Sequence, residues 1–249
     1  MLEITVLGCG SSLGVPVIGC DCAVCKSRSS YNKRSRSAIY ISGNNTKIII
    51  DFGFDIKDQL IKANIKELDG AILTHDHADH VAGIDNLRVF SFLQNCPLAI
   101  YTDIDTANII EDRYNYLFVK KALIMRPVDF FAKFKVNNLE IQFFRQNHGE
   151  IDSLGVRVGD FVYSNDVVNF PVESEPYLYN IKIWILDCID YISNDVHSGM
   201  DKVLQWNEKF KPEKIYLINM HHNIDYHTIS KELPHNIEPL YDGYKLVIR

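Results

Sequence analysis

The residues with the strongest chemical signal follow a short apolar run, residues 71–73, and read H-x-H-x-D-H. His75, His77 and His80 offer imidazole nitrogens and Asp79 offers a carboxylate, ligands that suit zinc, manganese or iron. The alternating spacing points His75 and His77 the same way, while Asp79 and His80 continue round the following turn. One segment can therefore supply ligands to two adjacent metal ions. A solvated loop is the alternative, and the density of ligands argues against it.

Two more ligand candidates follow apolar runs later in the chain. His148 comes just after a strand expected at 139–144, and Asp166 follows the run 161–165. A dinuclear hydrolytic site needs a carboxylate between the two cations to offset their mutual repulsion. Asp166 has the position for that bridging role. Either residue alone would be interpreted as a turn residue, but together with the H-x-H-x-D-H motif they predict a metal site.

Three of the six cysteines cluster as C-x-C-x-x-C, at Cys20, Cys22 and Cys25. In a reducing compartment such a triplet is typical of a metal site rather than of disulfides. We expect Cys9, Cys96 and Cys188, which are isolated in the sequence, to be buried small hydrophobes.

The composition is that of an ordinary globular protein. Among the 249 residues 47% are hydrophobic and 23% charged, and the formal net charge of −6 provides no overall basic field for nucleic acid. The opening residues 1–7 lack a basic segment followed by a long apolar stretch and read as a first strand. No stretch approaches the roughly 20 apolar residues that span a bilayer. A cytoplasmic location is expected.

Short apolar strands alternate with helical patterns along the whole chain. Strands are expected at 4–7, 38–41, 47–50, 70–73, 98–101, 139–144, 155–158, 160–163, 182–186, 214–217 and 245–248, and helices at 55–63, 84–93, 106–113 and 200–210. No linker or repeat divides the chain, so we expect one domain over residues 1–249, with two packed sheets and helices outside. The weakly patterned residues 113–138 are expected to be an insertion near the site that could act as a lid.

The glycine-rich residues 8–14, with Asp51 and the ligand candidates above, resemble the metallo-β-lactamase-fold hydrolases. The resemblance implies an α/β fold, a four-layer αβ/βα sandwich. It also implies that His75, His77 and His148 hold one ion, that Asp79 and His80 hold a second, and that Asp166 bridges the two. Asp51 would support the ligands from behind.

The cysteine triplet narrows the resemblance to the branch that contains the phosphoribosyl cyclic phosphate phosphodiesterase of phosphonate breakdown. The resemblance also covers residues 8–16, 34–37, 83–88, 186–187, 231–234 and 241–243. In that branch three cysteines and a histidine hold a structural zinc, which implies Cys20, Cys22, Cys25 and His222 here. His197 would assist the leaving oxygen, and His227 matches a histidine near the substrate mouth.

The chain departs from the family pattern at one ligand. The family places its last metal histidine in a Thr-His-x-x-His segment, and Ile218 and Asn219 stand where Thr and His belong. Three consequences are open: the second ion binds loosely, His221 swings in from two residues away, or the site works with one ion.

These patterns predict a metal-dependent hydrolase, a phosphodiesterase that cleaves a small cyclic or nucleotide-like phosphodiester through a metal-bound hydroxide. His197 and Asp79 are the expected catalytic residues. The expected cofactors are two divalent ions, Zn²⁺ or Mn²⁺ with Fe²⁺ as a further alternative, and one structural Zn²⁺. The alternatives are a non-catalytic or weakly active binding protein, which Asn219 supports, and a nuclease of the tRNA 3′-processing type, which the acidic charge disfavours. A homodimer is compatible with the sequence, and no membrane partner is expected.

Overall fold

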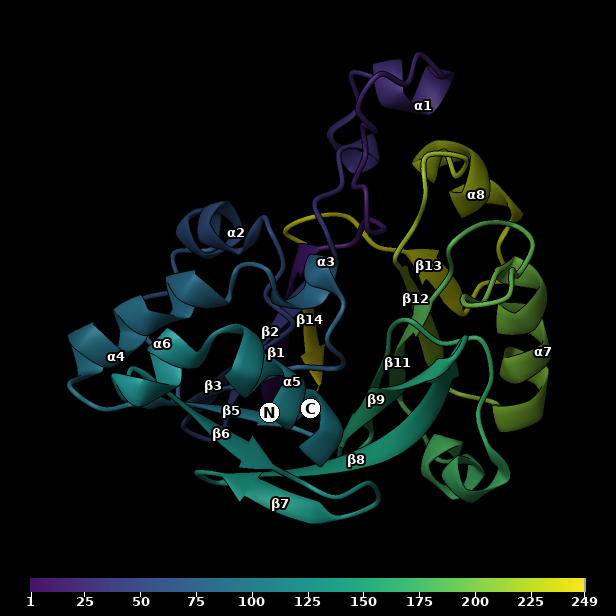
Figure 1. The fold of residues 1–249 in the computed structure, drawn as a ribbon. Helices are drawn as coiled ribbons and strands as arrows, with labels where there is room; N and C mark the ends of the chain where they lie inside the picture. Colours follow the sequence, from purple (N-terminus) through teal and green to yellow (C-terminus); the bar gives the residue numbers. More distant parts are fainter. Residues whose placement is uncertain (249) are drawn as a thin grey trace.

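Two seven-stranded sheets pack face to face in the computed structural model, which describes residues 1–248 (Figure 1). The first sheet has the order β14 (Lys245–Ile248), β1 (Leu2–Gly8), β2 (Ala38–Gly43), β3 (Thr46–Ile50), β4 (Gly70–Ile72), β5 (Leu98–Thr102) and β6 (Leu123–Pro127). The second has the order β13 (Ile237–Pro239), β12 (Lys214–Ile218), β11 (Ile183–Asp187), β10 (Phe161–Ser164), β9 (Ile151–Val158), β8 (Leu139–His148) and β7 (Lys133–Val136).

Helices cover the outer faces of both sheets. The helices of the described residues are α1 (Ala23–Lys26), α2 (Ile56–Lys62), α3 (Ala78–Val81), α4 (Arg88–Gln94), α5 (Ile104–Arg113), α6 (Asn115–Val119), α7 (Met200–Phe210) and α8 (Tyr226–Glu232), with 3₁₀ turns at Ser30–Asn32, Ile84–Leu87 and Val172–Leu178. The short helix α1 lies in a segment that projects from the sandwich. Figure 1 shows α2, α4 and α6 on the side of the first sheet and α7 on the side of the second. The expected four-layer αβ/βα sandwich is therefore confirmed.

The alternation of side chains along β3 shows how one strand serves two cores. Ile48 and Ile50 point into the core between the sheets, whereas Ile49 points outward and packs with the helices of the first sheet. Successive side chains of a strand face opposite sides, so a strand buried on both faces is a continuous apolar run. The run 48–50 is such a sequence.

Each sheet combines parallel and antiparallel pairs, and this arrangement brings the site together. β3, β4, β5 and β6 are parallel neighbours in the first sheet, and β10, β11, β12 and β13 are parallel neighbours in the second. Two antiparallel pairings, β8 with β9 and β9 with β10, give β8 the same direction as β10. The carboxyl ends of these strands therefore lie at a shared edge of each sheet.

Three parts of the structure differ from the sequence-based expectations. Residues 113–138, expected to be an insertion, contain β6 and β7, which close the edges of the two sheets and belong to the sandwich itself. Cys96, expected to be buried, is exposed. The strand β13 was not foreseen, because its three residues are too few for a period to show.

Among residues 1–248, every helix is too short or too polar to span a bilayer.

Candidate metal centre

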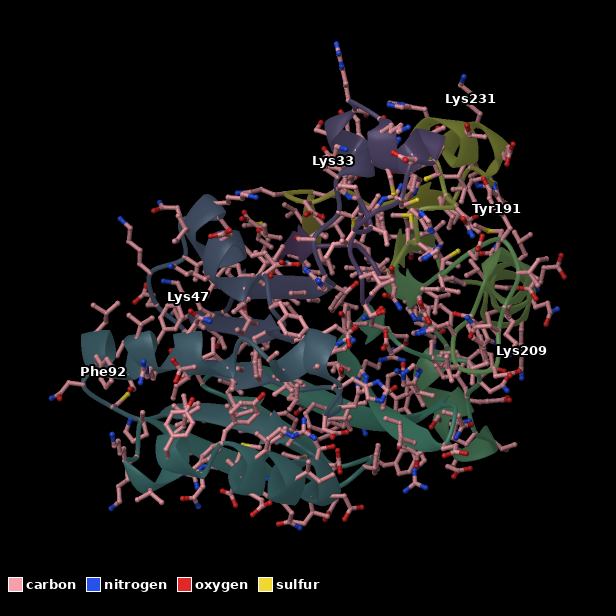
Figure 2. All side chains as sticks on the ribbon, turned by 45° about the horizontal axis from the view of Figure 1, so that its top comes forward. Lys33, Lys47, Phe92, Tyr191, Lys209 and Lys231 are labelled. Atoms are coloured by element: carbon pink, nitrogen blue, oxygen red, sulfur yellow. The ribbon has the colours of Figure 1, made fainter. Side chains whose placement is uncertain are left out.

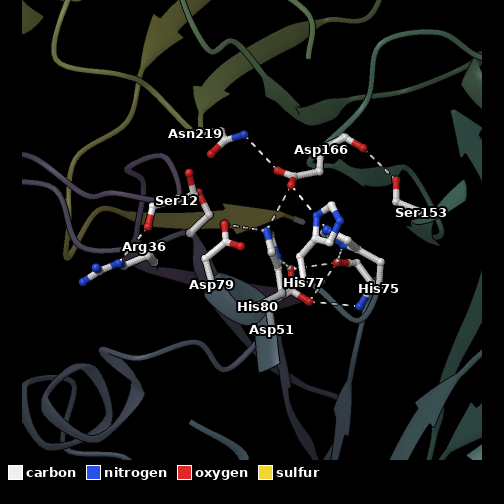
Figure 3. A network of polar contacts seen from close by, with 12 residues as sticks. Ser12, Arg36, Asp51, His75, His77, Asp79, His80, Ser153, Asp166 and Asn219 are labelled. Carbon is white, nitrogen blue, oxygen red and sulfur yellow. Dashed lines mark hydrogen bonds and ion pairs between the residues drawn. The ribbon is translucent and has the colours of Figure 1, made fainter. Parts of the chain in front are cut away.

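Most candidate ligands of the central site lie at the carboxyl end of a strand or in the loop that follows it. Asp51 follows β3 and the H-x-H-x-D-H segment follows β4, so the parallel pairing makes them neighbours. His148 ends β8, and Asp166 comes two residues after β10. The two sheets meet at this edge, and Figure 3 shows the side chains converging there. The tertiary fold thus brings together segments that are about 90 residues apart in the sequence.

Three acidic or amide residues at these strand ends adopt left-handed backbone conformations. The φ angles are 63° at Asp51, 50° at Asp166 and 66° at Asn219. Asp and Asn tolerate this region better than other non-glycine residues do. The turns aim three short polar side chains into one buried site, where backbone strain is a common feature.

The first cluster joins His75, His77, His148 and Asp166, whose ligand atoms all lie within 4.8 Å of one another. Nε2 of His75 and Nε2 of His148 each lie 3.4 Å from Oδ2 of Asp166. Nε2 of His148 lies 3.3 Å from Nδ1 of His77. Three imidazoles and one carboxylate around a common point form a donor set that suits a divalent transition metal.

Hydrogen bonds behind the cluster select the imidazole tautomers. Nδ1 of His148 donates to the carbonyl of Val196 at 2.8 Å, which leaves Nε2 with its lone pair toward the cluster. The Thr74 hydroxyl donates to Asp51 and accepts from Nδ1 of His75 at 3.0 Å. Nε2 of His75 is buried without a hydrogen-bond partner. Burial lowers the pKa of His75 to about 4, so its imidazole is neutral, as a metal ligand must be. These residues fit a bound cation.

The second cluster joins Asp79, His80 and Asp166. Nε2 of His80 lies 3.2 Å from Oδ2 of Asp79 and 3.1 Å from Oδ2 of Asp166. Burial opposes a charge on His80, yet the carboxylates of Asp166, Asp51 and Asp79 raise its pKa well above the ordinary value. Several carboxylates around one imidazole create a negative potential that favours a cation.

Asp51 supports both clusters from behind. Its carboxylate accepts hydrogen bonds from the backbone N–H and the hydroxyl of Thr74, both at 2.9 Å, and lies 2.8 Å from Nδ1 of His80. The side chain is fully buried. Asp51 therefore orients His80 directly and His75 through Thr74, which is how residues behind a metal site commonly tune its ligands.

Asp187 is a site residue to which the sequence analysis assigned no role. It ends β11, is fully buried and lies 3.1 Å from Nδ1 of His197 through Oδ2. Burial opposes a charge on His197, but the adjacent Asp187 raises the pKa of His197 to about 9. The sequence does contain a signal for this residue: Asp187 follows the apolar run 183–186, just as Asp51 follows the apolar run 48–50.

Asn219 follows β12, at the position where the family has its last metal histidine. Its side chain does not make the contact that a metal-binding histidine would make. Its side-chain nitrogen donates to Oδ1 of Asp166 at 2.8 Å and to Oδ1 of Asp187 at 3.0 Å. Figure 3 shows the amide reaching toward Asp166 from the side opposite His75. His221, the residue that could have replaced the missing histidine, packs its ring 4.0 Å from the ring of His222 and lies outside both clusters.

A separate cluster lies at α1, in the segment that projects from the sandwich (Figure 1). Cys20, Cys22, Cys25 and His222 offer ligand atoms within 4.8 Å of one another, with the three sulfurs 3.0, 3.5 and 3.4 Å from Nδ1 of His222. In Figure 2, sulfur atoms gather between the labelled Lys33 and Tyr191. The backbone N–H of Cys25 is the main cause that lowers the pKa of Cys22 to about 6. A thiolate-rich set of this kind suits tetrahedral zinc.

Arg34 and His227 contact other segments of the chain and not the residues of the metal clusters. Arg34 is 2% exposed and donates to the carbonyls of His221 and Ile224. His227 lies at the start of α8, where Nε2 is 3.0 Å from the Ser29 hydroxyl. Both residues attach the N-terminal segment to the C-terminal one.

Two packed sheets with clustered His and Asp donors at their common edge define the class of metallo-β-lactamase-fold hydrolases. The chain belongs to this superfamily, because the family model described as "Beta-lactamase superfamily domain" matches residues 46–221.

Known proteins agree with this assignment. A crystal structure described as a new diphosphatase from the PhnP family superposes with a TM-score of 0.94 and 29% identity, covering 98% of this chain and 96% of that one. Zn²⁺-bound PqqB from Methylobacterium extorquens has a TM-score of 0.82 at 15% identity, covering 99% of this chain and all of that one, and shows the fold alone. An octanoyltransferase of Porphyromonas gingivalis is 29% identical in an alignment of 252 positions, which covers 98% of this chain but 51% of that protein. The chain thus spans about half the length of this curated relative.

Proposed function

We propose that this metal-dependent hydrolase cleaves small phosphodiesters at the cluster of His75, His77, His148 and Asp166. The observation that carries the proposal is the position of His197 beside that cluster, with its ring centroid 4.8 Å from that of His148. A cation site next to a hydrogen-bond donor matches what phosphoryl transfer needs, because charge develops on the phosphate and on the leaving oxygen together. The similarity to a PhnP-family diphosphatase supports a phosphate ester as the substrate.

The residues of this chain have distinct roles in the proposed reaction. A divalent ion on the cluster supplies Lewis acidity and lowers the pKa of bound water toward ~7. His197 is held through Nδ1 by Asp187, so Nε2 is the atom left to donate a proton to the departing oxygen. Oδ2 of Asp79 lies 3.2 Å from Nε2 of His80, where it would hold a cation or orient water.

We assign a structural role to the Cys₃His cluster. Zinc there would connect the segment of α1 with the loop before α8, across about 200 residues of sequence. This connection would stabilise the fold without touching substrate.

The test is hydrolysis of bis-p-nitrophenyl phosphate and of a cyclic ribose phosphate by protein reconstituted with Zn²⁺ or Mn²⁺. We expect turnover with at least one of them, and a loss of at least about 100-fold in His197→Ala without loss of metal. His75→Ala should lose both metal and activity. If neither substrate is cleaved while His75→Ala still lowers the metal content, the phosphodiesterase proposal fails and the metal site stands.

A second candidate is hydrolysis of an acyl thioester, which the octanoyltransferase relative favours. One exposed apolar side chain lies near Asp79: the backbone of Gly53 packs directly on that of Asp79, and the next residue, Phe54, is 56% exposed. Such a surface would suit a medium-length acyl chain. Cleavage of octanoyl-coenzyme A without cleavage of either phosphodiester would replace the first proposal by this one.

A nuclease or a binding protein of this fold would give different results. A nuclease would cleave a tRNA 3′ trailer, and a binding protein would retain zinc at the cysteine cluster without binding metal at the histidine cluster.

A further inference from the structure

The two oxygens of Asp166 face different partners, and this difference bears on how many ions the centre holds. Oδ2 lies within 3.1–3.4 Å of the Nε2 atoms of His75, His80 and His148. Oδ1 instead accepts a hydrogen bond from the side chain of Asn219 at 2.8 Å. Oδ2 therefore faces the imidazoles of both clusters. In this chain one of the two oxygens already has a different partner.

Asn219 uses both of its amide hydrogens on buried carboxylates. One goes to Oδ1 of Asp166 and the other to Oδ1 of Asp187 at 3.0 Å, and Asn219 is only 2% exposed. The NH₂ group has two hydrogens, so none remains. The network also determines the orientation of the amide, because the reverse orientation would set the carbonyl oxygen against two carboxylates. The amide therefore presents hydrogens, not a lone pair, to this side of Asp166.

An amide nitrogen in this orientation cannot coordinate a cation, and its hydrogens carry partial positive charge. A second ion beside Asp79 and His80 would lack the family's histidine and would face these hydrogens across Asp166. It would retain Asp79 and His80, with Asp166 shared and already hydrogen-bonded. The donor set of the second position is therefore incomplete, whereas that of the first position is not.

We propose that this centre holds one tightly bound divalent ion, on His75, His77, His148 and Asp166, and that Asn219 replaces the second ion by clamping Asp166 to Asp187. The clamp also connects the metal ligand to the partner of His197, because Asp187 contacts both Asn219 and His197. This inference rests on the proposed metal centre and is independent of the proposed substrate.

The experiment counts ions in the full-length protein without substrate. Apo-protein is reconstituted with excess Mn²⁺ after the cysteine cluster has been loaded with Zn²⁺, desalted, and measured by mass spectrometry and electron paramagnetic resonance. We expect about one Mn²⁺ per chain and the spectrum of an isolated ion. Asn219→His supplies the missing imidazole and should bind about two Mn²⁺, with the spectrum of a coupled pair. Asn223→His, a substitution at an exposed asparagine four residues away, should stay at one.

A second variant provides a further test, and two results would overturn the proposal. Asn219→Asp, which adds a carboxylate ligand of nearly the same size, should also bind a second ion, so the test survives if Asn219→His fails to fold. Two tightly bound Mn²⁺ ions and a coupled spectrum in the unmodified chain would overturn the proposal, and so would a single ion in both folded variants. Since no substrate is present, an inactive protein that holds one ion would refute the proposed function and leave this inference intact.

Discussion

Asp187 receives two different side chains on its two oxygens: Asn219 at 3.0 Å on Oδ1 and Nδ1 of His197 at 3.1 Å on Oδ2. The backbone N–H of Val167 adds a third hydrogen bond at 3.2 Å. A buried carboxylate with this many partners orients the groups around it, because each broken bond would leave a polar atom unsatisfied. Asp187 therefore positions His197 without touching the metal cluster.

Asp187→Asn tests that positioning role. The amide cannot hold the Nδ1–H of His197 as the carboxylate does, so we expect kcat to fall about 100-fold while KM and metal content change little. The exposed Asp195→Asn, in the same loop as His197, is the matched control and should keep full activity. Unchanged kcat in Asp187→Asn would remove His197 from the reaction.

Cys22→Ser tests the cysteine cluster. With one thiolate missing we expect the protein to lose about one equivalent of zinc while the histidine cluster keeps its metal. The melting temperature should also fall, by about 2–4 °C for each kcal/mol of unfolding free energy that a chain of this size loses. Cys96→Ser, at an exposed cysteine outside the cluster, should retain both zinc and melting temperature. Equal zinc content in the two variants would show that the cluster binds no metal.

Arg34→Met tests how the N-terminal segment is attached. The guanidinium donates to the carbonyl of His221 at 3.1 Å, to that of Ile224 at 2.8 Å and to the side chain of Asn32 at 3.1 Å. Removing these donors leaves buried acceptors unpaired, which we expect to cost about 3 kcal/mol of unfolding free energy. The exposed Arg28→Met should cost less than about 0.5 kcal/mol. Urea denaturation followed by circular dichroism measures both, and equal values would contradict the structural role of Arg34.

Asp225 provides a pH-dependent prediction, because it begins α8 as its N-cap residue. Burial raises the pKa of this carboxyl, but hydrogen bonds from Asn32 and Thr228 outweigh burial and lower it below the ordinary value. A carboxyl with a lowered folded-state pKa stabilises the fold above its unfolded pKa of about 3.9, and this contribution is lost as the pH falls through the folded-state pKa.

The Asp225→Ala variant should therefore be about 1 kcal/mol less stable than the unmodified chain at pH 7, and the difference should shrink as the pH falls below about 4. Urea unfolding at a series of pH values from 7 to 3.5 measures this difference. The exposed Asp58→Ala should show no such trend, and a difference for Asp225 that grows toward low pH would have the wrong sign.

Much of the site followed from local sequence alone. The spacing of His75, His77, Asp79 and His80 after a buried strand is a property of six consecutive residues, so no tertiary information was needed to suspect metal ligands. The same holds for the apolar runs that became central strands, because a strand buried on both faces must be apolar throughout. The edge strands β6 and β7 were not predicted, because their residues are partly exposed and do not form a continuous apolar run. The sequence around them reads as an insertion instead.

Contacts between distant segments could not be inferred in this way. The structural role of Arg34 could not be predicted, because its acceptors, the carbonyls of His221 and Ile224, lie about 190 residues away in the sequence. In the sequence, Asn219 is only a departure from the family's histidine. It can act as a clamp because the fold brings both Asp166 and Asp187 within hydrogen-bond distance of its amide. Residue types and short spacings carry the chemistry of single ligands. The direction in which each hydrogen bond points depends on how the two sheets pack, and only the folded chain settles that.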